Sequence, residues 1–260
     1  MDINNIGKFL DKIKKSELAV GMVVTLSDPA VSELAGDAGY DFTWIDMEHA
    51  PLNIETVHAH IMALRGTNAA PFVRVTWNEH GVIKPVLDLA PAAVIIPMVN
   101  SAEAAEAAVS ACRYPPKGTR GCGVRRAVRY GVTPFGDYLK ASESEPLVIV
   151  QIEHIDAVRN LDAILKVPGI DSICIGPCDL SGSMGKLNQL DDPELNRVID
   201  EICLKTRKAN IILGSATGYS QQIFDKWRKR GLQWTAISGD CGCIFAQSRQ
   251  LIADAKKHDN

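Results

Sequence analysis

Short apolar runs alternate with longer segments of helical periodicity along this chain. Most of the runs are rich in Val and Ile without alternating polar residues, which is typical of strands buried on both faces. They predict eight strands, at Val20–Leu26, Phe42–Asp46, Pro71–Val75, Ala93–Met98, Leu147–Ile152, Ser172–Ile175, Ile211–Leu213 and Trp234–Ile237. The segments that follow them predict helices, at Ala30–Ala38, Ile54–Leu64, Val82–Leu89, Ala102–Cys112, Ala157–Leu165, Glu194–Ala209, Gln221–Arg230 and Cys243–Lys257.

Eight strands that alternate with helices predict an α/β fold, specifically a (β/α)₈ TIM barrel formed by residues 1–260 as a single domain. The alternative is an open doubly wound sheet. Against that alternative, no Gly-x-Gly-x-x-Gly follows the first predicted strand. In a barrel of this type the chemistry lies at the carboxyl ends of the strands, so the residues at those ends are the candidates for a site.

The composition narrows the class of protein. Hydrophobic residues make up 46% of the 260 residues and charged residues 23%, as in an ordinary globular protein. The net charge of −3 gives no electrostatic reason to expect nucleic acid or a membrane as a partner. The first residues do not resemble a signal peptide, and no run is apolar for the roughly 18 residues of a transmembrane helix. Seven cysteines without a C-x-x-C spacing suggest reduced thiols, so we expect a cytoplasmic protein.

Two acids follow neighbouring predicted strands. Glu153 comes after the fifth strand and Asp179 after the sixth, so both carboxylates are expected at the same end of a parallel sheet. Two carboxylates with water molecules are a typical protein contribution to an octahedral Mg²⁺ or Mn²⁺ site, in which the substrate fills the remaining positions. The other interpretation is a pair of strand-end acids satisfied by lysines or backbone amides. The spacing leaves both open.

Other strand ends carry further candidates. Asp46 and His49 follow the second strand, where the carboxylate could hold the imidazole in one tautomer for proton transfer. A single loop histidine is, however, more often structural or simply exposed. Arg74 lies between two valines in the third strand, and a buried arginine needs an anionic partner, which is either a protein carboxylate or a substrate. At the sixth strand end, Gly176 permits close approach of a ligand, and the amides of Cys178 and Asp179 could bind a carboxylate.

One connection is longer than the others. It joins the helix that ends near Cys112 to the strand at Leu147 and contains several arginines, namely Arg120, Arg125, Arg126 and Arg129. Long loops in compact domains are usually functional or disordered. The arginines could bind an acidic substrate or another subunit, or they could form a solvated basic loop. The sequence favours neither interpretation.

Taken together, these motifs resemble the HpcH/HpaI aldolases, which are metal-dependent class II pyruvate aldolases, including those of the 2,4-dihydroxyhept-2-ene-1,7-dioate aldolase type. The resemblance extends from about Gly21 to Asp240 and rests on an ordered set of motifs: Asp46-x-Glu-His-Ala-Pro, Val-Arg74-Val-x-Trp-Asn, Pro97-Met-Val, Tyr114-Pro-Pro-x-Gly-x-Arg-Gly, Val-Gln-Ile-Glu153 and Ile-Gly-Pro-x-Asp179-Leu-Ser. It implies a (β/α)₈ barrel in a homo-oligomer, a hexamer built as a trimer of dimers, with the C-terminal helix swapped between subunits.

The resemblance also implies roles for individual residues. The metal ligands are Glu153 and Asp179, for Mg²⁺, Mn²⁺ or Co²⁺. The catalytic residues are His49, Asp46 that orients it, Arg74 that stabilises an enolate, and Asp88, an acid that reaches a neighbouring subunit's site. The keto acid is bound by Gln151 and by the turn formed by Gly176, Pro177 and Cys178.

The implied reaction is the reversible cleavage of a 4-hydroxy-2-keto acid to pyruvate and an aldehyde through a metal-bound enolate, in aromatic or sugar-acid catabolism. Related enolate chemistry, such as oxaloacetate decarboxylation or acyl-CoA lysis, is an alternative, as is a non-catalytic protein that binds a metal or a keto acid. The segment after the seventh strand, Gly214 to Ser220, departs from the family pattern where an apolar contact to pyruvate is common. The basic loop departs as well, so the aldehyde stays open.

Overall fold

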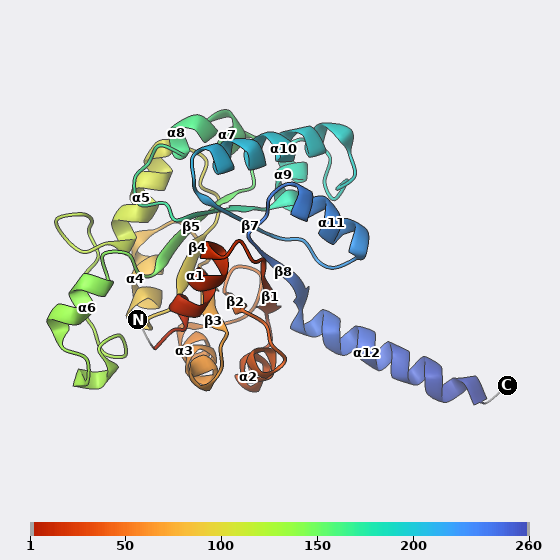
Figure 1. Cartoon of the computed structure of the whole chain (residues 1–260), viewed down its shortest axis with the longest axis horizontal. Helices are drawn as coiled ribbons and strands as arrows, with labels where there is room; N and C mark the ends of the chain where they lie inside the picture. The colour runs from red at the N-terminus through yellow and green to blue at the C-terminus, as the bar shows by residue number, and fades with distance from the viewer. Residues whose placement is uncertain (1–2, 259–260) are drawn as a thin grey trace.

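A closed barrel of eight parallel strands forms the centre of the molecule in the computed structural model, which describes residues 3–258 (Figure 1). The strands follow one another around the barrel in chain order, and β8 pairs with β1 to close it. They are β1 (Ala19–Val24), β2 (Phe42–Asp46), β3 (Ala70–Arg74), β4 (Ala93–Ile96), β5 (Leu147–Ile152), β6 (Ser172–Ile175), β7 (Ile212–Ala216) and β8 (Trp234–Gly239). The predicted (β/α)₈ fold is confirmed, and the predicted strand ends differ from the observed ones by at most three residues.

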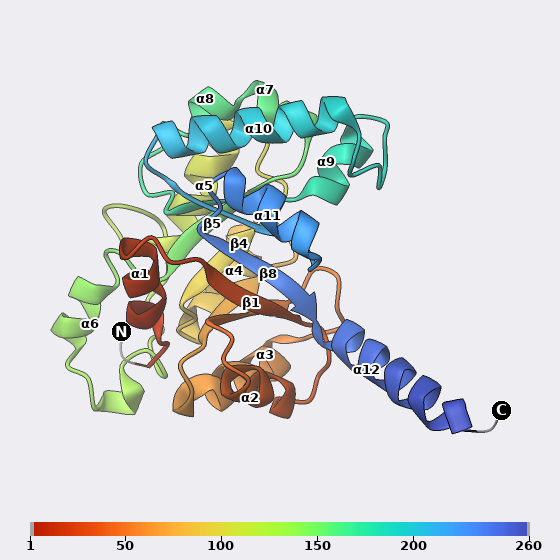
Figure 2. The same ribbon diagram turned by 45° about the vertical axis from the view of Figure 1, so that its right-hand side comes forward.

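Helices accompany the strands, and most of them pack on the outer side of the barrel, whereas α12 projects away from it (Figure 2). They are α1 (Ile6–Lys14), α2 (Ala30–Asp37), α3 (Ile54–Ala63), α4 (His80–Asp88), α5 (Ala102–Cys112), α6 (Phe135–Ala141), α7 (Ile155–Arg159), α8 (Leu161–Ile164), α9 (Pro177–Ser183), α10 (Pro193–Lys208), α11 (Gln221–Lys229) and α12 (Asp240–Ala255), with 3₁₀ turns at Leu64–Gly66, Arg129–Gly131 and Lys256–His258. The sequence pattern did not predict α1, α6 or α9. The predicted helix at Ala157–Leu165 is divided into α7 and α8 at Asn160, whose backbone leaves the helical region.

Aromatic rings fill the inside of the barrel at its N-terminal end. Phe9 from α1 packs edge-on against Phe72, which stacks on Phe42 with ring centroids 4.7 Å apart. Trp234 adds a fourth ring, and a Cβ atom at Gly214 would lie 1.8 Å from it. Glycine at position 214 is therefore what makes room for the indole. Aliphatic residues form a second core between the strands and the outer helices.

The basic loop, which is the part of the connection between α5 and β5 that contains Arg120 to Arg129, lies near the N-terminal ends of the strands. Arg120 and Arg126 are buried, and both donate hydrogen bonds to backbone carbonyls at the end of α4 and just beyond it, those of Leu87, Leu89 and Ala90. The last carbonyls of a helix have no partner within the helix, so these arginines satisfy them. Arg125 and Arg129 are exposed. The loop is therefore partly a structural element, and in this chain it lies at the opposite end from the predicted site.

The C-terminal helix α12 leaves the body of the protein in both views (Figures 1 and 2). Its first residue is fixed, because the Asp240 carboxylate accepts hydrogen bonds from the backbone amides of Thr25 and Leu26. Beyond that point its large apolar side chains are exposed, among them Ile244, Phe245, Leu251 and Ile252. Within residues 3–258, no helix combines the length and apolar character that crossing a membrane requires.

Candidate active site

Apart from Asp88, the predicted site residues come together at the carboxyl ends of the strands. Asp46 and Arg74 are the last residues of β2 and β3, while Glu153 and Gly176 directly follow β5 and β6. All strand pairs are parallel, so these ends form one rim. The convergence that the sequence predicted is therefore present, although the role of each residue depends on its contacts.

Glu153 is a deeply buried carboxylate on this rim, with only 3% of its surface exposed. One oxygen accepts a hydrogen bond from the Met98 amide at 2.7 Å, and the other accepts one from the Gln151 side chain at 2.7 Å. Burial raises the pKa of Glu153 to about 7; the Met98 hydrogen bond opposes this shift, and the charges of Glu48 and Asp179 add to it. Met98 has a positive φ of 54°, so the backbone bends unusually to direct its amide at this carboxylate.

Asp179 lies in the first turn of α9 and is exposed. The turn before it is pressed against Glu153, because a Cβ atom at Gly176 would lie 2.7 Å from the Glu153 side chain. No side chain could be added there without displacing the carboxylate. Pro177 opens the helix and has no N–H, whereas the amides of Cys178 and Asp179 lie in the first turn, where no helical carbonyl reaches them. They are thus placed to receive a carboxylate group.

The donor set of this rim fits a hard divalent cation. Glu153 and Asp179 bring two carboxylates within electrostatic range, and each Glu153 oxygen keeps one lone pair beyond its N–H contact. A cation would oppose the burial and the carboxylate repulsion that together raise the pKa of Glu153. Residues 3–258 contain no cluster of three or more His, Cys, Asp or Glu side chains suited to a metal. With Glu153 and Asp179 as ligands, water and substrate would fill the remaining positions of an octahedral site.

Arg74 is a buried cation with protein carboxylates on two sides. Its Nε and Nη2 atoms donate to Asp46 at 2.9 and 2.5 Å, and its Nη1 atom lies 2.9 Å from a Glu48 oxygen. Burial by itself would lower the pKa of Arg74, but the hydrogen bonds and charge of Asp46, with the charge of Glu48, outweigh burial and raise it. The guanidinium lies over the Trp44 ring, 5.0 Å from its centroid. The Nη1 atom of Arg74 also lies 3.5 Å from the side-chain oxygen of Gln151. The side-chain nitrogen of Gln151 in turn binds Glu153, so this edge of the guanidinium faces Glu153.

In the structure the Asp46 carboxylate binds Arg74, so the orienting of the His49 ring by Asp46 stays a prediction. Asp46 pairs with Arg74 because the two residues are opposite each other in the register of β2 and β3, which directs their side chains to the same face. Asp46 fixes His49 only through its backbone, accepting from the His49 amide at 3.3 Å. The imidazole, whose side chain is 62% exposed, lies instead 3.9 Å from Glu48.

Glu48 was not among the predicted site residues. Its carboxylate lies between Arg74 and His49, and the contact with Arg74 is not aligned as a hydrogen bond. Burial raises its pKa, Arg74 and His49 lower it, and Asp46 and Asp179 raise it. Its place in the same turn as Asp46 and His49 was the signal in the sequence that would have indicated it.

Asp88 is not on this rim. It ends α4, shortly before β4 begins, and pairs with Lys84 at 3.4 Å and Arg120 at 3.7 Å. It therefore lies at the N-terminal end of the barrel, away from Glu153 in the same chain. A contribution of Asp88 to a neighbouring subunit's site stays a prediction.

The model of the HpcH/HpaI aldolase/citrate lyase family matches residues 19–241. This chain belongs to that family. A family member from Enterobacter sp. (strain 638), a 5-keto-4-deoxy-D-glucarate aldolase, is 36% identical over 255 residues, which are 96% of this chain and 96% of the relative. A 4-hydroxy-2-oxo-heptane-1,7-dioate aldolase of Escherichia coli is 34% identical over 250 residues, or 94% of this chain and 93% of the relative.

The solved structures agree on the fold of the family. The HpcH/HpaI aldolase from Desulfitobacterium hafniense DCB-2 superimposes with a TM-score of 0.89 at 24% identity, over 95% of this chain and 96% of that one. The predictions of the HpcH/HpaI family and of a carbon–carbon lyase are thus confirmed, because curated relatives over nearly the full chain are aldolases. The interpretation as a non-catalytic binding protein is set aside.

Proposed function

We propose that this chain reversibly cleaves a 4-hydroxy-2-keto acid to pyruvate and an aldehyde in sugar-acid catabolism. The observation that carries the proposal is the buried chain Arg74–Gln151–Glu153, which joins a cation to a carboxylate on the rim that also carries His49. The aldolase names of the relatives support the same reaction class. The closure of all eight strands into one barrel supports a single domain over residues 1–260.

Glu153 and Asp179 would hold the divalent metal, and Mg²⁺, Mn²⁺ and Co²⁺ all accept such oxygen ligands. When bound, the metal supplies a Lewis acid that withdraws electrons from the substrate carbonyl. The amides of Cys178 and Asp179 orient the substrate carboxylate at the start of α9. Gln151 holds one Glu153 oxygen at 2.7 Å, so the carboxylate keeps its orientation while the substrate enters.

Arg74 stabilises the negative charge that develops on the C2 oxygen when the C3–C4 bond breaks. Its guanidinium is already oriented by Asp46 and Glu48, so little reorganisation is needed at the moment of reaction. His49 takes the proton of the C4 hydroxyl and returns it in the direction of synthesis. The Glu48 carboxylate lies beside the imidazole that takes this proton, 3.9 Å from the His49 ring.

A pyruvate-release assay tests this function. The protein is supplied with a panel of 4-hydroxy-2-keto acids, with and without a chelator, and each metal is then added back. We expect the chelator to abolish pyruvate release and one or more of the three metals to restore it. Full activity in rigorously metal-free protein would contradict the proposal.

The homo-oligomer implied by the family is supported by α12. Its apolar residues Phe245 and Ile252 are exposed, while an apolar cavity of about 330 Å³ is open beside α2, lined by residues such as Val31 and Leu34. A hexamer of three dimers that exchange α12 would cover both surfaces. Light scattering tests this arrangement: Phe245→Asp with Ile252→Asp should yield smaller species, whereas an unchanged mass would contradict it.

A further inference from the structure

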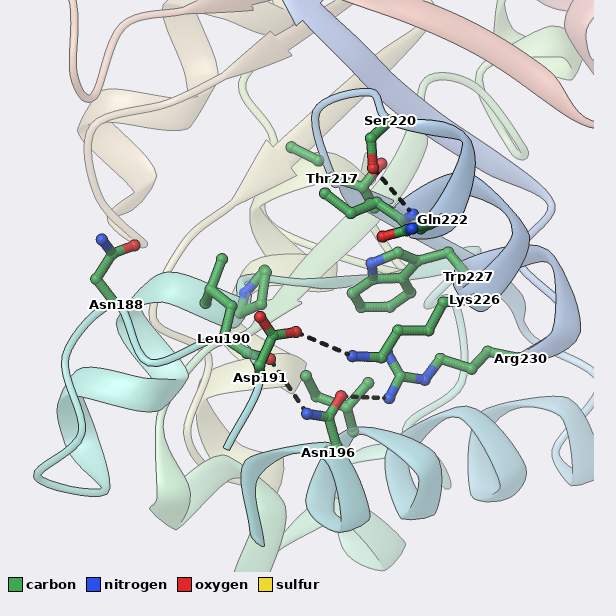
Figure 3. Close-up of a pocket in the computed structure, with 14 residues that line it drawn as sticks. Asn188, Leu190, Asp191, Asn196, Thr217, Ser220, Gln222, Lys226, Trp227 and Arg230 are labelled. Atoms are coloured by element: carbon green, nitrogen blue, oxygen red, sulfur yellow. Dashed lines mark hydrogen bonds and ion pairs between the residues drawn. The ribbon is translucent and has the colours of Figure 1, made fainter. Parts of the chain in front are cut away.

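A cavity of about 610 Å³ lies beside the candidate active site, among α9, α10 and α11 (Figure 3). Its volume is within the range of about 300–1,000 Å³ that is usual for small-molecule sites. Pro177, two residues from Asp179, and Ala216, the last residue of β7, form its inner boundary. Ala216 also packs against the cluster inside the barrel, so the cavity begins at the barrel mouth. It extends outward to Lys226 and Arg230.

The charges on the cavity wall are balanced. Arg230 donates to Asp200 at 2.7 Å. It also donates to Asn196 at 2.8 Å, and Lys226 lies 3.7 Å from the exposed carboxylate of Asp191 (Figure 3). Each cation thus faces a carboxylate of the chain. A ligand segment in this cavity meets no uncompensated positive charge, which favours a neutral segment over an anionic one.

The remaining lining combines an aromatic side chain with neutral polar groups. Trp227 is 6% exposed, Arg230 lies over its ring at 4.8 Å, and Figure 3 shows the indole nitrogen on the cavity side. The Trp227 indole and the exposed Gln222 side-chain amide both line the cavity. Thr217 and Ser220 add hydroxyl groups. An apolar ring beside polar donors and acceptors suits a carbon chain that carries hydroxyl groups.

From this lining we infer that the cavity binds the hydroxylated carbon chain of the aldehyde portion of the substrate. The inference rests on the proposed aldolase function and adds the chemical class of the second substrate, a neutral polyhydroxylated aldehyde. Gln222 and the Trp227 N–H recognise its hydroxyl groups, and the indole ring packs against its carbon skeleton.

Condensation of pyruvate with two aldehydes of equal length, glyceraldehyde and propanal, tests this inference on the metal-loaded protein. The measured quantity is the ratio of kcat/KM for glyceraldehyde to kcat/KM for propanal. Gln222→Ala and Trp227→Phe each remove a hydrogen-bonding group, and Trp227→Phe keeps an aromatic ring beneath Arg230. We expect each variant to lower the ratio about three- to tenfold, as for the loss of one hydrogen bond.

Gln221→Ala is the matched control, because Gln221 is the adjacent residue on α11 but bonds outward to Asp225. Its ratio should equal that of the unmodified protein. An unchanged ratio in both cavity variants, or an equal loss in the control, would overturn the inference while condensation with propanal upheld the aldolase function. Absence of condensation with either aldehyde would overturn the aldolase function and the inference with it.

Discussion

Arginines are buried at both ends of this barrel, but their donors face opposite kinds of partner. At the carboxyl end, Arg74 pairs with the carboxylates of Asp46 and Glu48, and these partners raise its pKa despite burial. At the N-terminal end, Arg126 donates to neutral backbone carbonyls. Burial lowers the pKa of Arg126, a shift that Tyr130 opposes and the charge of Arg65 reinforces.

The difference separates a chemical role from a structural one. Arg126 holds the loop after α5 against the end of α4 through hydrogen bonds to neutral carbonyls. Arg74 forms part of a network of charges whose remaining edge is directed to Gln151 and Glu153. Burial of an arginine therefore does not indicate a site by itself, whereas the partners of its donors do.

The largest effect is expected from Arg74→Lys. Lysine keeps the positive charge but loses the planar fork that pairs with Asp46, so the charge is no longer held toward the substrate. We expect kcat for pyruvate release to fall about 100- to 1,000-fold, as when a stabilising donor is removed from an active site. Steady-state kinetics on protein of unchanged circular dichroism measures it. A fall of less than about threefold would mean that the comparison between the two ends is mistaken.

The pH dependence of the folding stability tests the cost of burying the Glu153 carboxylate at the carboxyl end of the barrel. The pKa of Glu153 is raised from 4.5 to about 7, so in the metal-free protein the folded state holds this proton over a range in which the unfolded chain has lost it. Stability must therefore fall as the pH rises through that range, by about 3 kcal/mol in total, and stay lower above it.

Thermal melts of chelated protein measure this dependence. Glu153→Gln should remove most of the fall, because the amide does not ionise. If the melting temperatures of the unmodified protein and of Glu153→Gln changed in parallel between about pH 5 and pH 8, ionisation of Glu153 would not lower the stability of the folded state, and the prediction would be wrong.

A smaller effect is expected at the opposite end from Arg126→Lys. The carbonyls of Leu89 and Ala90 lose donors, so the free energy of unfolding should fall by about 1–2 kcal/mol. Because Arg126 is remote from the strand-end rim, kcat per folded molecule should not change. Denaturant titration and kinetics on the same sample measure both, and a loss of kcat similar to that of Arg74→Lys would be inconsistent with a structural role.

The smallest effect is expected from Glu48→Gln. Asp46 still holds Arg74 by two hydrogen bonds, but the carboxylate beside His49 is gone, so kcat/KM should fall about three- to tenfold. Glu143→Gln is the control, since that acid pairs with Lys117 on the exposed surface. Equal values for Glu48→Gln and the unmodified protein would remove Glu48 from the site.

The fold could be predicted from the sequence because strands buried on both faces leave a simple apolar pattern. The rim followed from the fold: once the strands were ordered, Glu153 and Asp179 had to emerge at the same end. The partner of Arg74 could not be predicted in this way, because it depends on the register that sets Asp46 opposite it. The role of Arg126 could not be predicted from the sequence either, because the carbonyls that accept its hydrogen bonds are about 36 residues away in the chain.

The short elements were also beyond the apolar pattern. Helix α9 has seven residues, too few for a helical period to be recognised, and its sequence Gly176–Pro177 reads as a turn. The projection of α12 away from the barrel could not be predicted either, because the periodicity of a helix does not indicate which molecule its apolar face will contact.

With α12 packed on a partner, part of the core of each subunit would belong to another molecule. The Asp240 hydrogen bonds hold the base of the helix to its own barrel, whereas the apolar side chains further along it are exposed without a partner molecule. Dilution would then expose Phe245 and the cavity beside α2 together. The melting temperature of this protein should consequently rise with its concentration, as the law of mass action requires.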